Sequence, residues 1–204
     1  MAEALLIIDV QNDFLPGAAL GVPDGDQVIE PINALAADPR FAVVVATRDW
    51  HPPDHSSFQS QGGPWPRHCV RDTDGAQLSG RLDQSAIDAV IDKGTSVEAD
   101  GYSAFETEAL RDLLREEHVT AVTIVGLATD YCVRHTATDA LREALIVTID
   151  PTAIRGIDDR RHKRPYPSCQ RRVRPWGRRL PRVSGPCGSA CRGVAVREEA
   201  PPAG

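Results

Sequence analysis

Short runs of apolar residues, rich in Val and Ile, recur along residues 1–157, and each ends at a polar or charged position. Their length and β-branched content are typical of strands buried on both faces of a sheet. The predicted strands are 4–8, 41–47, 89–94, 119–126 and 144–150. The predicted helices, in which apolar residues follow helical spacing, are 26–37, 107–118 and 129–143. This alternation predicts an α/β fold of three layers, α/β/α, with a mainly parallel sheet.

The pattern stops at residue 158. Residues 158–204 have no helical or alternating periodicity and are dense in Arg, Pro and Gly, so we expect an atypical basic tail that is disordered or loosely packed. Residues 1–157 carry 25 acidic and 11 basic side chains, a balance of −14, whereas residues 158–204 carry 4 acidic and 12 basic, a balance of +8. The acidic part gives no reason to expect nucleic-acid binding. For the tail, an acidic partner or nucleic acid stays an alternative.

At 204 residues the chain is long enough for one domain of ordinary size with a full hydrophobic core. No apolar run approaches the ~18 residues that cross a membrane, and the first residues lack the basic segment of a signal peptide. We therefore expect a cytoplasmic protein without membrane contact. Five cysteines at irregular spacing argue against a disulfide framework.

Reactive side chains stand at the ends of the predicted strands. Asp9, Asp49 and Lys93 each lie at or just after the carboxyl end of one strand, and Cys132 follows another after a short loop. In parallel α/β sheets the carboxyl ends of the strands meet at one edge, where ligands bind. We therefore expect these four side chains to form one site.

Cys132 lies in the segment "GLATDYCVRH", where a predicted strand turns into a helix. The pair Thr129–Asp130 is a plausible N-cap, which places Cys132 in the first helical turn. The free N–H groups and the dipole of that turn favour a thiolate and lower a thiol pKa. The same N–H groups can hold an oxyanion. The alternative is a buried structural cysteine.

Asp9 and Lys93, which belong to the same group of four side chains, also have a functional and a structural interpretation. Asp9 can take the thiol proton and later deliver it to a leaving amine, or it can simply cap a helix. Lys93 can pair with a thiolate and stabilise negative charge, or it can be a solvated surface lysine. Their shared position at the sheet edge favours the functional interpretation for both.

A second group follows the strand 41–47 in "RDWHPPDH" and in the later segment "WPRHC". Asp49 and His51 alternate at the end of a strand, so both side chains point the same way, and His68 returns from a loop. One carboxylate and two histidines suit Zn²⁺, Fe²⁺ or Mn²⁺; His55 is a further ligand or a partner of a ligand. The same set holds iron in non-haem oxygenases, but those enzymes usually have β-sandwich or jelly-roll scaffolds, which the α/β pattern disfavours.

Six segments together resemble a known family: "LLIIDVQNDFLPGAAL", "TRDWHPPDHSSF", "WPRHCV", "AIDAVIDKG", "YSAF" and "VGLATDYCVRHTATDAL". Their content and order are similar to those of nicotinamidases, also called pyrazinamidases, within the isochorismatase-like cysteine hydrolases. The resemblance covers about residues 4–157. It implies a metal-dependent amidohydrolase that converts nicotinamide to nicotinate and ammonia through a Cys thioester, with pyrazinamide as a second expected substrate.

The resemblance also implies roles for single residues. The implied catalytic triad is Asp9, Lys93 and Cys132, and the implied oxyanion hole is formed by the N–H groups of Ala128, after a cis peptide bond, and Cys132. The implied ligands of one divalent metal ion (Zn, Fe or Mn) are Asp49, His51 and His68, with His55 added in some members. The implied pocket residues are Phe14, Leu20, Trp65, Tyr102 and Ala104. In the implied reaction the ring nitrogen of nicotinamide binds the metal directly or through water.

After Ile157 the sequence departs from the family, which normally continues with one more helix and strand. The abrupt loss of pattern resembles a reading-frame shift, and we expect an exposed sheet edge as its consequence. Two alternatives to a nicotinamidase stay open: an amidase of the same superfamily that acts on another small amide, and a destabilised relative without activity. The metal, a homo-oligomeric state and the preference between nicotinamide and pyrazinamide also stay open.

Overall fold

The computed structural model describes residues 2–99 and 101–157. Within these residues the predicted strands and helices all occur. The strands are β1 (Ala2–Ile8), β2 (Phe41–Asp49), β3 (Ala89–Lys93), β4 (Val119–Leu127) and β5 (Ile146–Arg155). The α-helices are α1 (Ile29–Ala36), α2 (Glu108–Glu116) and α3 (Arg134–Arg142). The predicted tail, residues 158–204, lies outside the described residues.

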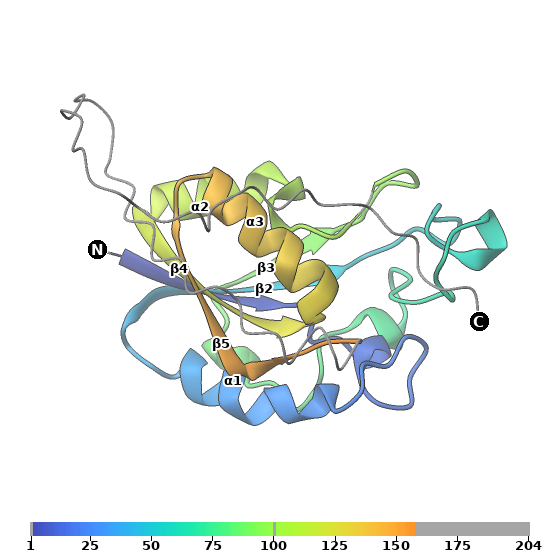
Figure 1. Ribbon diagram of the computed structural model, residues 1–204, viewed down its shortest axis with the longest axis horizontal. Coiled ribbons are helices and arrows are strands. Elements are labelled where there is room, and N and C mark those ends of the chain that lie inside the picture. Colours follow the sequence, from blue (N-terminus) through green and yellow to red (C-terminus); the bar gives the residue numbers. More distant parts are fainter. Residues whose placement is uncertain (1, 100, 158–204) are drawn as a thin grey trace, which may run out of the picture. The chain divides into compact units, whose positions relative to one another are not determined.

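The five strands form one sheet in the order β3-β2-β1-β4-β5, and every neighbouring pair is parallel. β1 is central, and α1 covers one face of the sheet while α2 and α3 cover the other (Figure 1). The prediction of a three-layer α/β/α fold with a parallel sheet is therefore confirmed. All strands end at the same edge, which brings the residues after β1, β2, β3 and β4 together.

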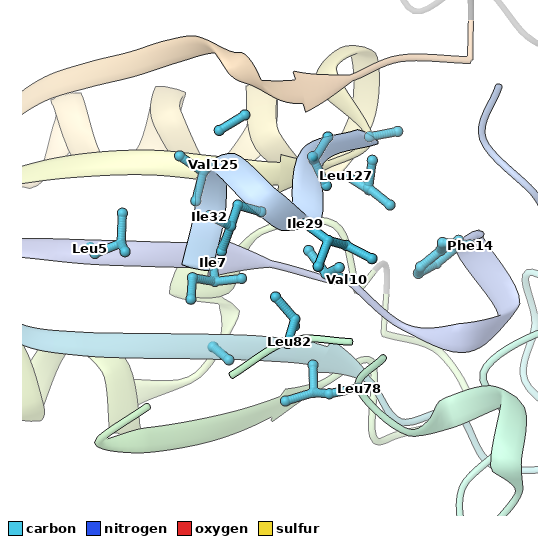
Figure 2. Close-up of a cluster of buried hydrophobic side chains, with 14 of the residues drawn as sticks. Leu5, Ile7, Val10, Phe14, Ile29, Ile32, Leu78, Leu82, Val125 and Leu127 are labelled. Carbon is cyan, nitrogen blue, oxygen red and sulfur yellow. The ribbon is translucent and has the colours of Figure 1, made fainter. Parts of the chain in front are cut away.

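Side chains alternate between two hydrophobic cores along the buried central strand. Leu5 and Ile7 of β1 pack with Ile29 and Ile32 of α1 in the core that Figure 2 shows. Leu6 of β1 and its neighbours on the same face pack in the second core, beneath α2 and α3. Because both faces of β1 are covered, its sequence is a continuous apolar run and not an alternating one.

The boundaries of two elements differ most from the predictions. The predicted helix 26–37 begins as a short 3-10 turn, Gly25–Val28, and α1 follows with Pro31 in its first turn, where a proline is tolerated. β5 runs five residues beyond the predicted end at 150, and its register on β4 shifts between Ile124 and Gly126. Pro151 lies in this stretch; proline has no N–H to donate, and β5 is at the edge of the described sheet, where a proline is tolerated.

The predicted helix 129–143 begins with a π-helical turn, Thr129–Val133, before α3. Single π turns inside helices are frequent at functional sites because the extra residue re-aims side chains. Among the described residues no helix is both long and apolar enough to cross a membrane.

Candidate active site

The four reactive side chains that end or follow strands meet at the carboxyl edge of the sheet. Asp9 follows β1, Asp49 ends β2, Lys93 ends β3, and Cys132 lies in the π turn after β4. Oxygens of the two carboxylates and the sulfur of Cys132 lie within 4.8 Å of one another. We call these four residues the ionic cluster.

Lys93 is the centre of the ionic cluster. Its side chain is fully buried, and Nζ lies 2.8 Å from Oδ2 of Asp9 and 3.6 Å from Sγ of Cys132. It also donates to Oδ1 of Asp49 and to the carbonyl of Gly101. Burial lowers its pKa, but the carboxylates of Asp49 and Asp9 raise that pKa well above the ordinary value. Lys93 is therefore a permanent cation, and the carboxylates of Asp9 and Asp49 balance its charge, as a buried ion requires.

The two carboxylates of the ionic cluster have pKa values on opposite sides of the ordinary one. Burial raises the pKa of Asp9 to about 6, against the influence of Lys93 and of the Thr47 hydroxyl, which donates to Oδ1 over 2.7 Å. Burial also acts to raise the pKa of Asp49, but Lys93 and His51 hold it below its ordinary range. Asp49 is therefore a permanent anion, and Asp9 is suited to proton transfer near neutral pH.

The thiol of Cys132 corrects one prediction. Burial raises its pKa well above the ordinary value; Lys93 acts in the opposite direction, and Asp9 and Asp49 add to the increase. We expected the helix N-terminus to favour a resting thiolate, but the side chain faces two carboxylates in a dry site. The resting group is therefore a thiol, and it needs a base to remove its proton.

The predicted N-cap pair Thr129–Asp130 is also corrected. Ala128 is the N-cap of the π turn, and no side chain caps it. The Asp130 carboxylate instead accepts a hydrogen bond from the N–H of Ile157, over 3.0 Å. The peptide bond before Ala128 is cis, as the resemblance implied. Just before it, Gly126 has a φ of +109°, and a Cβ there would lie 2.1 Å from the carbonyl oxygen of Ile8.

The three residues proposed as metal ligands are buried together. Ligand atoms of Asp49, His51 and His68 all lie within 4.8 Å of one another. Nδ1 of His51 lies 2.9 Å from the Gly94 carbonyl, and Nδ1 of His68 lies 2.7 Å from the Pro66 carbonyl. A carbonyl only accepts, so Nδ1 carries the proton in both rings and Nε2 keeps its lone pair. This is the tautomer that metal-binding histidines usually have.

The pKa values of these two histidines shift in opposite directions. Burial lowers the pKa of His68. Burial acts in the same direction on His51, but the hydrogen bond and the charge of Asp49 raise its pKa above the ordinary value. One carboxylate and two such imidazoles are the donor set that divalent zinc, iron and manganese accept, so the residues fit a metal.

His55 lies beside this group without being part of it. Its ring stacks on that of His51 with centroids 4.0 Å apart, and its Nδ1 lies 2.7 Å from the Ser57 hydroxyl. Burial and the charge of His51 lower its pKa to about 4. Its role as a ligand stays a prediction.

A pocket opens next to Cys132 and the predicted metal ligands. Its lining residues are Phe14, Leu20, Val22, Asp49, His51, Ser57, Trp65, His68, Tyr102, Ala128, Tyr131, Cys132 and Ile157. Four of them form what we call the aromatic wall: Phe14, Trp65, Tyr102 and Tyr131. Trp65 donates from Nε1 to the Tyr102 hydroxyl over 3.0 Å. Its ring makes an edge-to-face contact with the ring of Tyr131, with ring centroids 5.1 Å apart. The size and shape of such a site suit a flat ring.

Ala104 is the one predicted pocket residue that does not line the pocket. It is fully buried in the second core, and its N–H donates to the Thr136 hydroxyl. Tyr131 adds an aromatic ring to the lining, although its position in a predicted helix gave no sign of that role. The other lining residues that we did not predict are Val22, Ser57 and Ile157.

Two residues of the segment "QND" hold the predicted metal ligands in place, and the sequence analysis missed both. Gln11 is buried; it donates to the Asp49 carbonyl and accepts from the Asp49 N–H, both over 2.8 Å. Asp13 accepts from the N–H of Cys69, next to His68, over 2.7 Å. The signal was their place directly after β1, at the edge where ligands bind.

Comparison with known proteins extends this description. The isochorismatase-domain family matches residues 3–170. A nicotinamidase of Escherichia coli K12 is 40% identical over 179 residues, which cover 76% of this chain and 84% of that protein. The crystal structure of PnC1 from L. infantum in complex with nicotinate is similar at a TM-score of 0.76 and 41% identity, over 78% of this chain and 83% of that one. The pyrazinamidase of Pyrococcus horikoshii in complex with zinc is similar at a TM-score of 0.74 and 43% identity, over 80% and 92%.

Proposed function

The chain belongs to the isochorismatase-domain family, and from that premise we propose that it hydrolyses nicotinamide to nicotinate and ammonia. Pyrazinamide, which has a similar flat ring and the same carboxamide, is the proposed second substrate. The observation that carries the proposal is the position of Cys132, which lines an aromatic pocket and contacts a buried lysine and two carboxylates. Such a site combines a nucleophile, a base and a place for a ring.

In the first half of the proposed reaction, Asp9 takes the proton of Cys132 as the sulfur attacks the amide carbon. The high pKa of the thiol requires that transfer, and the pKa of Asp9, about 6, leaves it ionised at neutral pH. The new S–C bond places negative charge on the amide oxygen. The N–H groups of Ala128 and Cys132, which both line the pocket, are the proposed donors to that oxygen.

In the second half, the C–N bond breaks and Asp9 returns its proton to the nitrogen, which leaves as ammonia. A water molecule then attacks the thioester carbon, Asp9 accepts its proton, and the C–S bond breaks. That proton returns to the sulfur, so Cys132 is again a thiol, and the nicotinic acid gives its remaining proton to solvent as it leaves as nicotinate. Lys93 stays charged throughout and lies 3.6 Å from the sulfur, where it stabilises the thiolate as it forms and leaves.

We also propose that Asp49, His51 and His68 hold one divalent metal ion. Their ligand atoms gather within 4.8 Å, and both imidazoles keep the Nε2 lone pair toward the group. A metal held there would orient the substrate through its ring nitrogen. The three ligands line the same pocket as Cys132, so they place the ring where the carboxamide faces the sulfur.

Ammonia release from nicotinamide by the full-length chain tests the substrate, with benzamide as the matched control. Benzamide has the same carboxamide on a flat ring of the same size but lacks the ring nitrogen. We expect nicotinamide to be hydrolysed much faster. Equal rates would contradict the proposed orientation through the ring nitrogen, and faster release from another small amide would reassign the substrate.

A further inference from the structure

Two buried glycines contact Lys93 of the ionic cluster and His51 of the predicted metal ligands. Gly94 follows β3, Gly101 lies further along the same loop, and both have positive φ, +60° and +73°. A Cβ on Gly94 would lie 2.4 Å from Cε1 of His51, and one on Gly101 would lie 3.2 Å from the same atom. Only glycines allow the loop to pass this close to the His51 ring.

The carbonyl groups of these glycines accept hydrogen bonds from two residues of the site. The Gly94 carbonyl accepts from Nδ1 of His51 over 2.9 Å, which fixes the tautomer of that ring. The Gly101 carbonyl accepts from Nζ of Lys93. The orientation of a predicted ligand and the position of the buried cation therefore both depend on where this loop lies.

One carboxylate holds both glycines from outside. Oε1 of Glu106 accepts from the N–H of Gly94 over 3.2 Å, and Oε2 accepts from the N–H of Gly101 over 2.8 Å. Glu106 lies in the short turn Ala104–Glu106, whose start is fixed by a bond from the Phe105 N–H to the Ser103 hydroxyl. Hydrogen bonds to a charged acceptor are about twice as strong as neutral ones.

We propose that Glu106 is a positioning residue that holds His51 and Lys93 through the backbone of Gly94 and Gly101. It is not a catalytic residue, because it reaches the site only through these two amides. The inference rests on the proposed function for its effect on turnover. Its effect on metal affinity rests on the proposed metal site, and its effect on the two amides rests on the geometry of the loop alone.

Glu106→Gln is the most specific test, because it keeps the size of the side chain and changes only the group that the N–H groups of Gly94 and Gly101 contact. The amide oxygen still accepts from one glycine, whereas the NH₂ group faces the other N–H as a second donor. The side chain is exposed, so the replacement leaves no cavity in the core. Glu108→Gln is the matched control: it removes the same charge two residues away, from an exposed carboxylate that pairs with Arg111.

The experiment titrates the metal-free full-length variants with Zn²⁺ against a competing chelator and measures hydrogen exchange at Gly94 and Gly101. We expect Glu106→Gln to bind Zn²⁺ up to about 10-fold more weakly, the low end of the loss that follows removal of a direct partner of a ligand, because Glu106 acts on His51 only through Gly94. We also expect faster exchange at both amides, and a fall in kcat that exceeds any rise in KM. Glu108→Gln should match the parent chain in all three.

An unchanged Zn²⁺ affinity together with unchanged exchange in Glu106→Gln would overturn the inference. If that variant does not fold, Glu106→Asp replaces it, because the shorter side chain keeps the charge but cannot reach both amides; an unchanged affinity there overturns the inference equally. If the parent chain binds Zn²⁺ but releases no ammonia, the proposed function fails while the metal and exchange results still decide the role of Glu106.

Discussion

The ionic cluster and the aromatic wall contribute to the same pocket but are built differently. All members of the ionic cluster lie at strand ends or in the first turn after a strand, and they are buried. In the aromatic wall, Trp65 and Tyr102 come from loops, whereas Phe14 and Tyr131 come from short helical turns. Trp65, Tyr102 and Tyr131 are only half-buried. The ionic cluster is held together by paired charges in a buried interior. The aromatic wall instead offers contact area to a substrate and contains the Trp65–Tyr102 hydrogen bond. Substitutions should therefore affect stability in the cluster and substrate affinity in the wall.

Lys93→Met should have the largest effect. Removing the cation leaves the buried carboxylates of Asp9 and Asp49 without their counter-charge, and breaking a buried pair from one side costs about 3–5 kcal/mol. We expect a loss of that size in the free energy of unfolding, measured with urea at neutral pH, and no turnover. Trp65→Phe is the comparison from the aromatic wall and should unfold nearly as the parent chain does. Equal stability of the two variants would erase the distinction between the regions.

Asp9→Asn should separate chemistry from stability inside the ionic cluster. The amide cannot accept the thiol proton, so turnover should fall about 10²–10⁴-fold, the usual contribution of a general base. The pKa of Asp9 is already raised by burial, and a neutral side chain there should destabilise the fold less than the loss of Lys93 does. Steady-state rates and urea unfolding of the same preparation check both statements; a variant with normal turnover would remove Asp9 from the mechanism.

The dependence of kcat/KM on pH should report the ionisation of Asp9. The carboxylate is the active form and its pKa is about 6, so kcat/KM should be lost as the pH falls through 6 and reach a plateau above it. The raised pKa of the Cys132 thiol adds no second step in this range. The acid limb should be absent from the residual activity of Asp9→Asn. A limb that persists there belongs to another group.

Substitutions in the aromatic wall should have the smallest effect and should act on KM. Trp65→Phe and Tyr102→Phe each remove the same hydrogen bond, from Nε1 to the hydroxyl, while keeping an aromatic face. Each should raise KM about 2–10-fold, the value of one such bond, with kcat little changed. The effect of the double variant should be smaller than the sum of the two single effects, because both changes remove the same hydrogen bond. Additive effects in steady-state kinetics would show that the two rings act independently.

The sequence predicted the regular part of the molecule well for a physical reason. Strands buried on both faces are continuous apolar runs, and parallel topology then carries Asp9, Asp49, Lys93 and Cys132 to one edge without any further information. The ends of elements were less accurate. The π turn around Cys132 and the extension of β5 across Pro151 depend on contacts with neighbouring strands, which a local pattern does not contain.

Residues that support the site could not be predicted from spacing. Gln11 reaches Asp49 across 38 positions and Asp13 reaches Cys69 across 56, so neither contact leaves a periodic trace. Ala104 is the first residue of the turn that Ser103 caps, and its side chain is buried in the core instead of lining the pocket. The predicted direction of the Cys132 thiol pKa was wrong because helix position alone ignores the burial of the sulfur and the carboxylates that the fold places beside it.

The most direct test of the account is ammonia release from nicotinamide by the full-length chain, measured beside its Cys132→Ala variant with circular dichroism spectra of both. If Cys132 is the nucleophile, we expect turnover by the parent chain and a loss of roughly 10⁴-fold or more in the variant, as for other enzymes that lose their nucleophile. A folded Cys132→Ala chain that still releases ammonia at the parent rate would contradict the assignment of Cys132 as the nucleophile.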